Sequence, residues 1–296
     1  MNRLTSVCAA TFVMLSASAY SASVKKGETV AFLGDSITQF GAHAQTGYVN
    51  LVDAGLKANG IDVKLVKAGI SGHKSNQMLA RLDRDVLKKK PNWMLLSCGV
   101  NDVWHGSRGV PLGQYKKNIT EIVDKAQAAG VKVMILTATM IKEDADNSLN
   151  KQLAQYNVFL RKLANDKKCL IADLNDDMQK AVAKLKAEGY KGNILTRDGV
   201  HMNPFGDEMM ATGILKSFGL TDAELAKAKA AWLKLPVVYE LRFTRTRDRM
   251  PNITMTYEEA CILQGRAKKA GKSYDQYLKE IIQKSLKGAV ANELGK

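Results

Sequence analysis

From residue 29 onward, short apolar runs alternate with longer amphipathic stretches. The apolar runs predict strands over residues 29–33, 63–67, 93–97, 131–137 and 169–172. The stretches between and after them predict helices over residues 48–58, 75–87, 112–129, 149–165, 178–188 and 204–218. Near-continuous apolar strands are typical of a parallel sheet that is covered by helices on both faces. The pattern therefore predicts an α/β fold, a three-layer α/β/α sandwich around a five-stranded parallel sheet, which ends near Gly219.

The alternation stops after Gly219, and a different organisation follows. Thr221 and Glu224 form a capping-box pattern that predicts a helix over residues 221–234. Residues 237–252 are basic and partly extended, and residues 256–287 indicate one or two further helices. We therefore expect a catalytic domain over residues 24–219 and a basic, mainly helical C-terminal extension over residues 220–296. The extension contains no catalytic motif, and a packing or docking role is expected for it.

The first residues have the pattern of a secretory signal peptide. Arg3 precedes an apolar stretch over residues 7–15, and Ala17 and Ala19 supply a small-residue cleavage motif. We expect the signal peptide to be residues 1–19, with cleavage possible as late as residue 22. The alternative is a membrane anchor, but the apolar stretch is shorter than the ~20 residues that span a bilayer. The chain is thus expected to be secreted or periplasmic, without stable membrane insertion.

Cysteine usage and charge restrict the partners of the chain. Cys98, Cys169 and Cys261 remain after the signal peptide, and they cannot all pair with one another, so any disulfide stays an open question. There is no close Cys/His cluster, and no metal or other cofactor is expected. The net charge of +15 has a local peak at residues 242–249 but comes with no nucleic-acid-binding motif. A solvated surface and a weak polyanion contact through the extension are the two interpretations.

Four loops next to predicted strand and helix ends carry the residues suited to chemistry. They read Gly-Asp-Ser-Ile-Thr at 34–38, Ala-Gly-Ile-Ser-Gly-His at 68–73, Gly-Val-Asn-Asp at 99–102 and Asp-Gly-Val-His at 198–201. Each motif alone is a common turn or helix cap. In a parallel α/β sheet, however, the loops after the carboxyl ends of the strands gather at one edge. We therefore expect these loops to meet at one site.

In this order the four motifs resemble the blocks of the SGNH/GDSL hydrolase superfamily: GDS, a glycine loop, GxND and DxxH. The resemblance covers residues 29–218 and implies a flavodoxin-like SGNH hydrolase fold. It implies that Ser36 is the nucleophile, that His201 is the base and that Asp198 is the acid that orients it. It also implies an oxyanion hole formed by the N–H groups of Ser36 and Gly72 and the side chain of Asn101.

These residue types fit the chemistry of ester hydrolysis. A serine hydroxyl becomes a useful nucleophile when an imidazole takes its proton, and a carboxylate fixes the imidazole tautomer. We expect an exported serine esterase that removes a short acyl group, most plausibly acetyl, from a carbohydrate through an acyl-serine intermediate. The alternatives are a lysophospholipase or thioesterase of the same fold, and a non-catalytic polyanion-binding module. Tyr48, Trp104 and His105 are candidates for substrate contact, with core packing open for Tyr48 and an ordinary surface role for His105.

Overall fold

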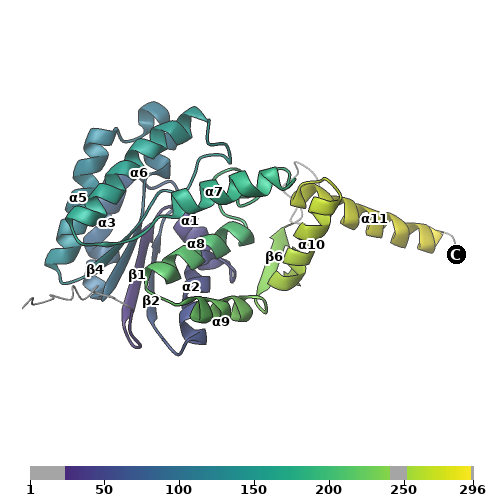
Figure 1. Ribbon diagram of the computed structural model, residues 1–296, viewed down its shortest axis with the longest axis horizontal. Coiled ribbons are helices and arrows are strands. Elements are labelled where there is room, and N and C mark those ends of the chain that lie inside the picture. The colour runs from purple at the N-terminus through teal and green to yellow at the C-terminus, as the bar shows by residue number, and fades with distance from the viewer. Residues whose placement is uncertain (1–23, 241–251, 295–296) are drawn as a thin grey trace, which may run out of the picture.

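The computed structural model describes residues 24–240 and 252–294 of the 296-residue chain. Figure 1 shows a central sheet between two helical layers, with the C-terminal helices at one end of the molecule. The predicted signal peptide, residues 1–19, and its latest cleavage position at residue 22 lie outside the described residues. The basic peak at residues 242–249 lies outside them as well.

The sheet has five parallel strands in the order β2-β1-β3-β4-β5. They are β1 (Thr29–Gly34), β2 (Lys64–Gly69), β3 (Trp93–Ser97), β4 (Lys132–Leu136) and β5 (Leu170–Ala172). The central strands β1 and β3 are almost fully buried, as expected for strands covered on both faces. The predicted five-stranded parallel sheet is confirmed. The chain passes from β1 to β2 on one side and then crosses back to β3 on the other side of β1. The gap between β1 and β3 is therefore the topological switch point.

Helices of the catalytic domain form the two outer layers. They are α1 (Ser36–His43), α2 (Tyr48–Ala58), α3 (Ser75–Asp85), α4 (Val100–Trp104), α5 (Leu112–Ala128), α6 (Ser148–Asp166), α7 (Leu174–Ala187) and α8 (Pro204–Ser217). Helices α3, α5 and α6 lie side by side on one face, and α2 and α8 pack together on the other (Figure 1). Short 3₁₀ turns follow α3 at Leu87–Lys89 and α4 at Gly106–Arg108.

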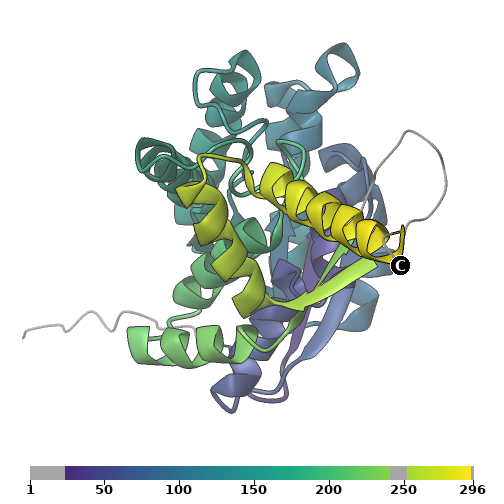
Figure 2. The same cartoon turned by 90° about the vertical axis from the view of Figure 1, so that its right-hand side faces the viewer.

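The C-terminal extension combines helices with a hairpin. It contains α9 (Asp222–Trp232), β6 (Pro236–Glu240), β7 (Asn252–Thr256), α10 (Tyr257–Lys269) and α11 (Tyr274–Leu294). The predicted capping box at Thr221 and Glu224 is present, and a second one starts α10 at Thr256 and Glu259. Strands β6 and β7 pair antiparallel, and α11 projects away from the body (Figures 1 and 2). The extension is mainly helical, as predicted.

Aromatic packing fixes the extension to α8. The ring centroids of Tyr257 and Tyr274 lie 5.9 and 5.6 Å from that of Phe205, at the start of α8. The Tyr257 hydroxyl donates to a carboxylate oxygen of Glu208 at 2.7 Å. Tyr257 also belongs to the same hydrophobic cluster as the sheet residues. The extension therefore shares the core of the catalytic domain.

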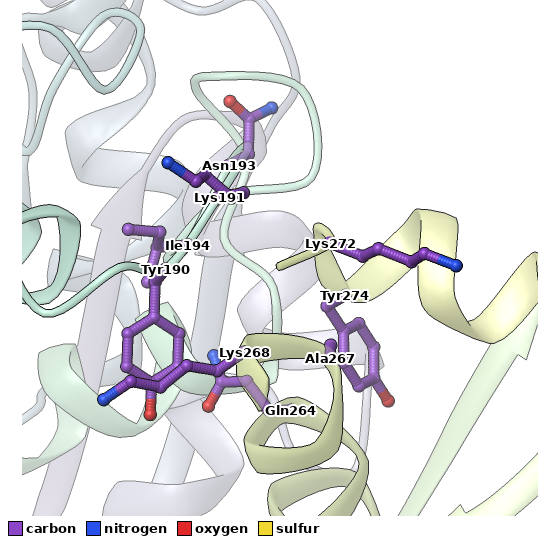
Figure 3. Close-up of a pocket in the computed structure, with 9 residues that line it drawn as sticks. All are labelled: Tyr190, Lys191, Asn193, Ile194, Gln264, Ala267, Lys268, Lys272 and Tyr274. Atoms are coloured by element: carbon purple, nitrogen blue, oxygen red, sulfur yellow. The ribbon is translucent and has the colours of Figure 1, made fainter. Parts of the chain in front are cut away.

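A shallow hollow lies between the segment at residues 190–194 and α10 (Figure 3). Lys268 and Lys272 line it, and both have carboxylate partners. The Lys268 ammonium lies 3.5 Å from Glu188 and 4.6 Å from the ring centroid of Tyr190, and Lys272 pairs with Glu280. Two of the three lysines that line the hollow thus have an acidic partner within the chain.

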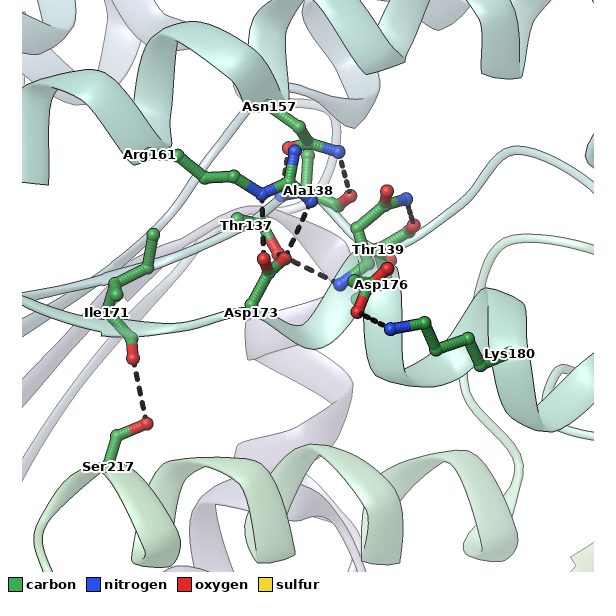
Figure 4. A network of polar contacts seen from close by, with 11 residues as sticks. Thr137, Ala138, Thr139, Asn157, Arg161, Ile171, Asp173, Asp176, Lys180 and Ser217 are labelled. Atoms are coloured by element: carbon green, nitrogen blue, oxygen red, sulfur yellow. Dashed lines mark hydrogen bonds and ion pairs between the residues drawn. The ribbon is translucent and has the colours of Figure 1, made fainter.

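A polar network joins the carboxyl ends of β4 and β5 to α6 (Figure 4). Arg161 binds Asp173 through two hydrogen bonds of 2.7 and 2.8 Å, and Thr137 donates to the same carboxylate. Asn157 bonds both the N–H and the carbonyl of Ala138, at 2.8 and 2.9 Å. These contacts hold the loop that leaves β4, which borders the candidate site.

Three further observations concern the described part of the chain. No helix in it is long and apolar enough to cross a membrane. Cys98, Cys169 and Cys261 are free thiols, and Cys98 is buried. Across residues 24–240 and 252–294, no group of three or more His, Cys, Asp or Glu side chains could hold a metal ion.

Candidate active site

The structure brings Ser36, His201 and Asp198 into one chain of hydrogen bonds. The Nε2 atom of His201 lies 2.9 Å from the Ser36 hydroxyl, and its Nδ1 lies 2.7 Å from Oδ2 of Asp198. Asp198 also accepts the backbone N–H groups of Val200 and His201 at 3.0 and 2.8 Å. Ser36 follows β1, while the other two precede α8. Residues that are 165 positions apart in the sequence therefore form a hydroxyl, imidazole and carboxylate relay.

Helix capping determines where Ser36 lies. Asp35 is the N-cap of α1, and its Oδ1 accepts the N–H of Ile37 at 2.9 Å. Ser36 is therefore the first residue of the helix. Its N–H belongs to the first turn, where helical N–H groups have no partner within the helix. The partial positive charge of a helix N-terminus favours a developing anion at this position.

Gly72 and Asn101 come from the loops after the two neighbouring strands. Gly72 has a φ of +76°, a conformation that glycine adopts without strain. Asn101 is in the first turn of α4, directly after β3. Its amide donates to Oδ2 of Asp35 and to the carbonyl of His73, at 3.2 Å each. Asn101 is thus linked both to the residue before Ser36 and to the residue after Gly72.

Burial and hydrogen bonding shift the pKa values of two carboxyl groups, Asp198 and Asp35, in opposite directions. Partial burial alone would raise the pKa of Asp198, but hydrogen bonds from the His201 ring and from backbone N–H groups lower it overall. Burial raises the pKa of Asp35 to about 6, although the Ile37 N–H opposes this shift. Asp198 is therefore ionised at neutral pH, in the form that orients an imidazole and stabilises its cation.

A buried arginine supports the strand ends beneath the site. Arg81, on α3, donates to the carbonyls of Gly34 and Ala68 at 2.8 Å each. Its Nε lies 3.1 Å from Nδ1 of His73, and its charge pairs with Asp85 at 3.1 Å. The carbonyls belong to β1 and β2, and His73 adjoins Gly72. Arg81 therefore fixes the loops of Ser36 and Gly72 relative to each other.

The predicted substrate contacts have different outcomes. Tyr48 is 0% exposed, and its hydroxyl is 2.8 Å from that of Thr38. It is therefore a core residue, so the prediction of substrate contact is wrong and the packing alternative applies. Trp104 is 42% exposed, and His105 is half-buried. Both follow Asn101 by about one helical turn, which places them on the same side of α4.

Two exposed side chains beside His201 were not anticipated from the sequence. Phe40 is 39% exposed and meets the His201 ring edge-on, with 5.0 Å between ring centroids. The Arg197 guanidinium lies over the Phe40 ring, 5.4 Å from its centroid. Phe40 is one helical turn after Ser36 and Arg197 directly precedes Asp198, so inspection of the motif neighbours could have found both.

The arrangement can carry out nucleophilic acyl transfer. It combines a hydroxyl and an imidazole at hydrogen-bond distance with a carboxylate that binds the second imidazole nitrogen. The same edge of the sheet presents a helix N-terminus, a glycine loop and an amide side chain. Fold and site together define an SGNH-type hydrolase.

Comparison with known proteins gives the family. The GDSL-like Lipase/Acylhydrolase family matches residues 32–209, more than half of the chain, and the chain belongs to this family. The acetylxylan esterase of Geobacillus stearothermophilus is 26% identical over 216 residues, which cover 66% of this chain and 96% of that protein. Esterase TesA of Pseudomonas aeruginosa is 36% identical over 110 residues, 37% of this chain and 53% of that protein.

The solved structures agree with the sequence comparison. A crystal structure of the acetyl xylan esterase AlAXEase is 35% identical, with a TM-score of 0.60. It covers 64% of this chain and 98% of that one. The remainder of this chain has no counterpart in that esterase. The chain is thus a carboxylic ester hydrolase of the SGNH type, as predicted.

Proposed function

We propose that Ser36 attacks the carbonyl carbon of an acetyl ester while Nε2 of His201 takes the hydroxyl proton. The attack forms a tetrahedral intermediate with a negatively charged oxygen. The N–H groups of Ser36 and Gly72 and the amide of Asn101 stabilise this oxygen. The observation that carries the proposal is the 2.9 Å contact between His201 and Ser36 together with the 2.7 Å contact between His201 and Asp198.

The second half of the reaction uses the same residues. The intermediate collapses, the bond between the carbonyl carbon and the alcohol oxygen breaks, and His201 gives its proton to the departing alcohol. An acetyl-serine remains. Water then attacks it with His201 as base, and acetate leaves as Ser36 regains its proton. Asp198 stays ionised throughout and stabilises the His201 cation.

We propose an acetylated carbohydrate as the substrate. Two matched relatives are named as acetylxylan esterases and cover most of the catalytic domain. Phe40 presents an exposed aromatic ring against His201, and Trp104 presents another, one helical turn after Asn101. Aromatic faces suit sugar rings. The carbohydrate supplies the alcohol that leaves in the first half of the reaction.

Nitrophenyl esters test the reaction and the acyl length. Wild-type protein should hydrolyse the acetate ester faster than the octanoate and palmitate esters. Ser36→Ala should lose nearly all of this activity. Only the ~10³- to 10⁴-fold acceleration over water that the oxyanion hole and binding give alone should remain. Full activity of Ser36→Ala would remove Ser36 from the mechanism. A preference for chains of eight or more carbons would instead favour a lysophospholipase or thioesterase.

Acetate release tests the substrate class. The protein is incubated with acetylated xylan, pectin, peptidoglycan and sialic acid, and free acetate is measured with Ser36→Ala as the blank. Release from at least one carbohydrate at a rate above that of nitrophenyl acetate supports the proposal. Hydrolysis of nitrophenyl acetate without release from any of the four would reject the carbohydrate while keeping the esterase.

We also propose that the chain is exported through residues 1–19. The basic start, apolar stretch and small-residue motif support this. Mass spectrometry of protein recovered from a periplasmic or culture fraction should find a new N-terminus at residue 20, or as late as residue 23. An intact Met1 on active cytoplasmic protein would contradict export.

A further inference from the structure

A buried carboxylate is hydrogen-bonded to the segment that leads to Asp198 and His201. Glu143 lies between β4 and α6 and is only 5% exposed. Its two oxygens accept the N–H of Ile194 at 2.6 Å, that of Leu195 at 2.7 Å and that of Thr196 at 2.6 Å. The Thr196 hydroxyl donates a fourth hydrogen bond at 2.8 Å. Glu143 therefore satisfies three successive buried N–H groups, which have no sheet or helix partner.

The segment that Glu143 binds, residues 194–196, leads directly into the turn of the relay residues. The Thr196 hydroxyl accepts the N–H of Gly199 at 3.1 Å, and the Arg197 N–H donates to the His201 carbonyl at 2.8 Å. The Lys142 N–H, beside Glu143, donates to the Gly199 carbonyl at 2.6 Å. Gly199 has a φ of +94°, and a Cβ there would lie 3.1 Å from Cα of Lys142. The turn that presents Asp198 and His201 is thus held by the loop of Glu143.

We propose that Glu143 is a positioning residue that sets the distance and angle of His201 relative to Ser36. Hydrogen bonds to an ionised acceptor are about twice as strong as neutral ones, and here all four are buried. Losing them leaves three backbone N–H groups at residues 194–196 without their acceptor, and the relay residues follow within five positions. A misplacement of ~1 Å at a reacting group costs on the order of 100-fold in rate. The inference rests on the roles proposed above for Asp198 and His201.

Glu143→Gln is the first test, assayed with nitrophenyl acetate. The glutamine amide keeps one acceptor oxygen and places an NH₂ group against backbone N–H donors. We expect kcat to fall about 100-fold with KM within about twofold, because the change affects alignment and not binding. An unchanged kcat in a folded variant would overturn the proposal.

Glu28→Gln is the matched control. Glu28 is likewise a carboxylate with several donors, although it is half-buried: they are the N–H of Lys25, the indole of Trp93 and the ammonium of Lys132. It lies at the amino end of the sheet, opposite the candidate site. We expect Glu28→Gln to lower the melting temperature and leave kcat unchanged. An equal loss of kcat in both variants would assign the effect to general destabilisation.

Thr196 gives a smaller change in case Glu143→Gln does not fold. Thr196→Val removes the hydroxyl that links Glu143 to Gly199, while Thr196→Ser keeps it. We expect a loss of about tenfold in kcat for the valine variant, within the cost of one hydrogen bond to a charged group. The serine variant should restore at least half of the wild-type kcat. Equal kcat in the two variants would contradict the proposal.

A double-mutant cycle separates positioning from folding. If Glu143 acts through His201, Glu143→Gln should not lower further the residual rate of His201→Ala. A further 100-fold loss in that background would show that Glu143 acts elsewhere. The proposed function fails separately: full activity of Ser36→Ala or His201→Ala would remove the relay itself, whatever Glu143 does.

Discussion

Asp35 and Ser36 are adjacent in the sequence, but Asp35 has a structural role and Ser36 faces the imidazole of His201. The Asp35 side chain is buried, caps α1 and accepts from Asn101, so it fixes the backbone on which Ser36 lies. Ser36 is 8% exposed and turns its hydroxyl towards His201. A buried carboxylate beside the nucleophile is tolerated because the Ile37 N–H and the Asn101 amide donate to it, although burial still raises its pKa to about 6. The side chain of Asp35 therefore determines where the Ser36 hydroxyl lies.

Asn101→Ala tests the side-chain donor of the oxyanion hole. Removing one such donor typically lowers kcat by ~100- to 1,000-fold, and we expect this with little change in KM. Asn59→Ala is the control, because the Asn59 amide bonds the carbonyls of Gly55 and Glu224, where α2 meets α9. Comparable losses of kcat in the two variants would argue against a donor role for Asn101.

The buried carboxyl group of Asp207 should make the free energy of unfolding depend on pH. Burial raises its pKa from 3.8 to about 7, opposed by the Tyr48 N–H that it accepts at 2.9 Å. Between these values the folded state holds a proton that the unfolded chain releases, so the free energy of unfolding falls as pH rises through this window. We expect Asp207→Asn, which keeps the Tyr48 bond, to stabilise the protein by about 2 kcal/mol at pH 8.

The same substitution should have no stabilising effect near or below pH 3.8, where the carboxyl is increasingly protonated in both states. Urea denaturation at pH 4 and pH 8 measures the difference. A gain of equal size at both pH values would show that packing, and not the charge of Asp207, sets the effect.

At the scale of elements, the sequence predicts a strand or helix correctly where its buried apolar residues recur with the period of that structure. Residues 93–97 were predicted as a strand and form β3, and 204–218 matches α8 within one residue. Helices α1 and α4 were missed because each starts inside a catalytic motif, where Ser36 and Asn101 were interpreted as loop residues. The predicted helix 178–188 begins earlier, at Leu174, because Leu174 is itself buried in the core.

The site was predictable only where a motif marks it. The motifs gave Ser36, Asp198 and His201, which the structure brings together. Glu143 and Arg81 have no local signal, because the backbone groups that they bind lie 51–53 and 13–47 residues away in the sequence. Such long-range contacts follow from topology and not from spacing.

Arg81→Lys tests the bond between α3 and the strand ends. Lysine has one charged group where Arg81 has a planar fork that reaches two carbonyls and His73. We expect a loss of about 2 kcal/mol in the free energy of unfolding, since at least one buried carbonyl loses its donor. Denaturant titration measures it. Arg84→Lys on the same helix, where the side chain is exposed, should change stability by less than about 0.5 kcal/mol.

At the scale of the whole molecule, the extension is continuous with the catalytic domain. The family match ends at residue 209, inside α8. Phe205 of α8 nevertheless packs against Tyr257 and Tyr274, and it follows His201 by four residues. The residues beyond the family match therefore cover the helix that begins just after the relay. This continuity predicts one cooperative unfolding transition for the described parts of the chain.

Tyr257→Ala combined with Tyr274→Ala should break this continuity. The double variant removes both rings from Phe205 and the hydrogen bond to Glu208. Truncating buried aromatic side chains costs ~3–5 kcal/mol each in a core, and less where they are partly exposed. We expect calorimetry to resolve two transitions, the first from the extension, where wild-type protein gives one. A single transition at a lower temperature would mean that β6, β7, α10 and α11 are held by other contacts. Ile262→Ala, which changes an exposed residue of α10, should leave the wild-type profile intact.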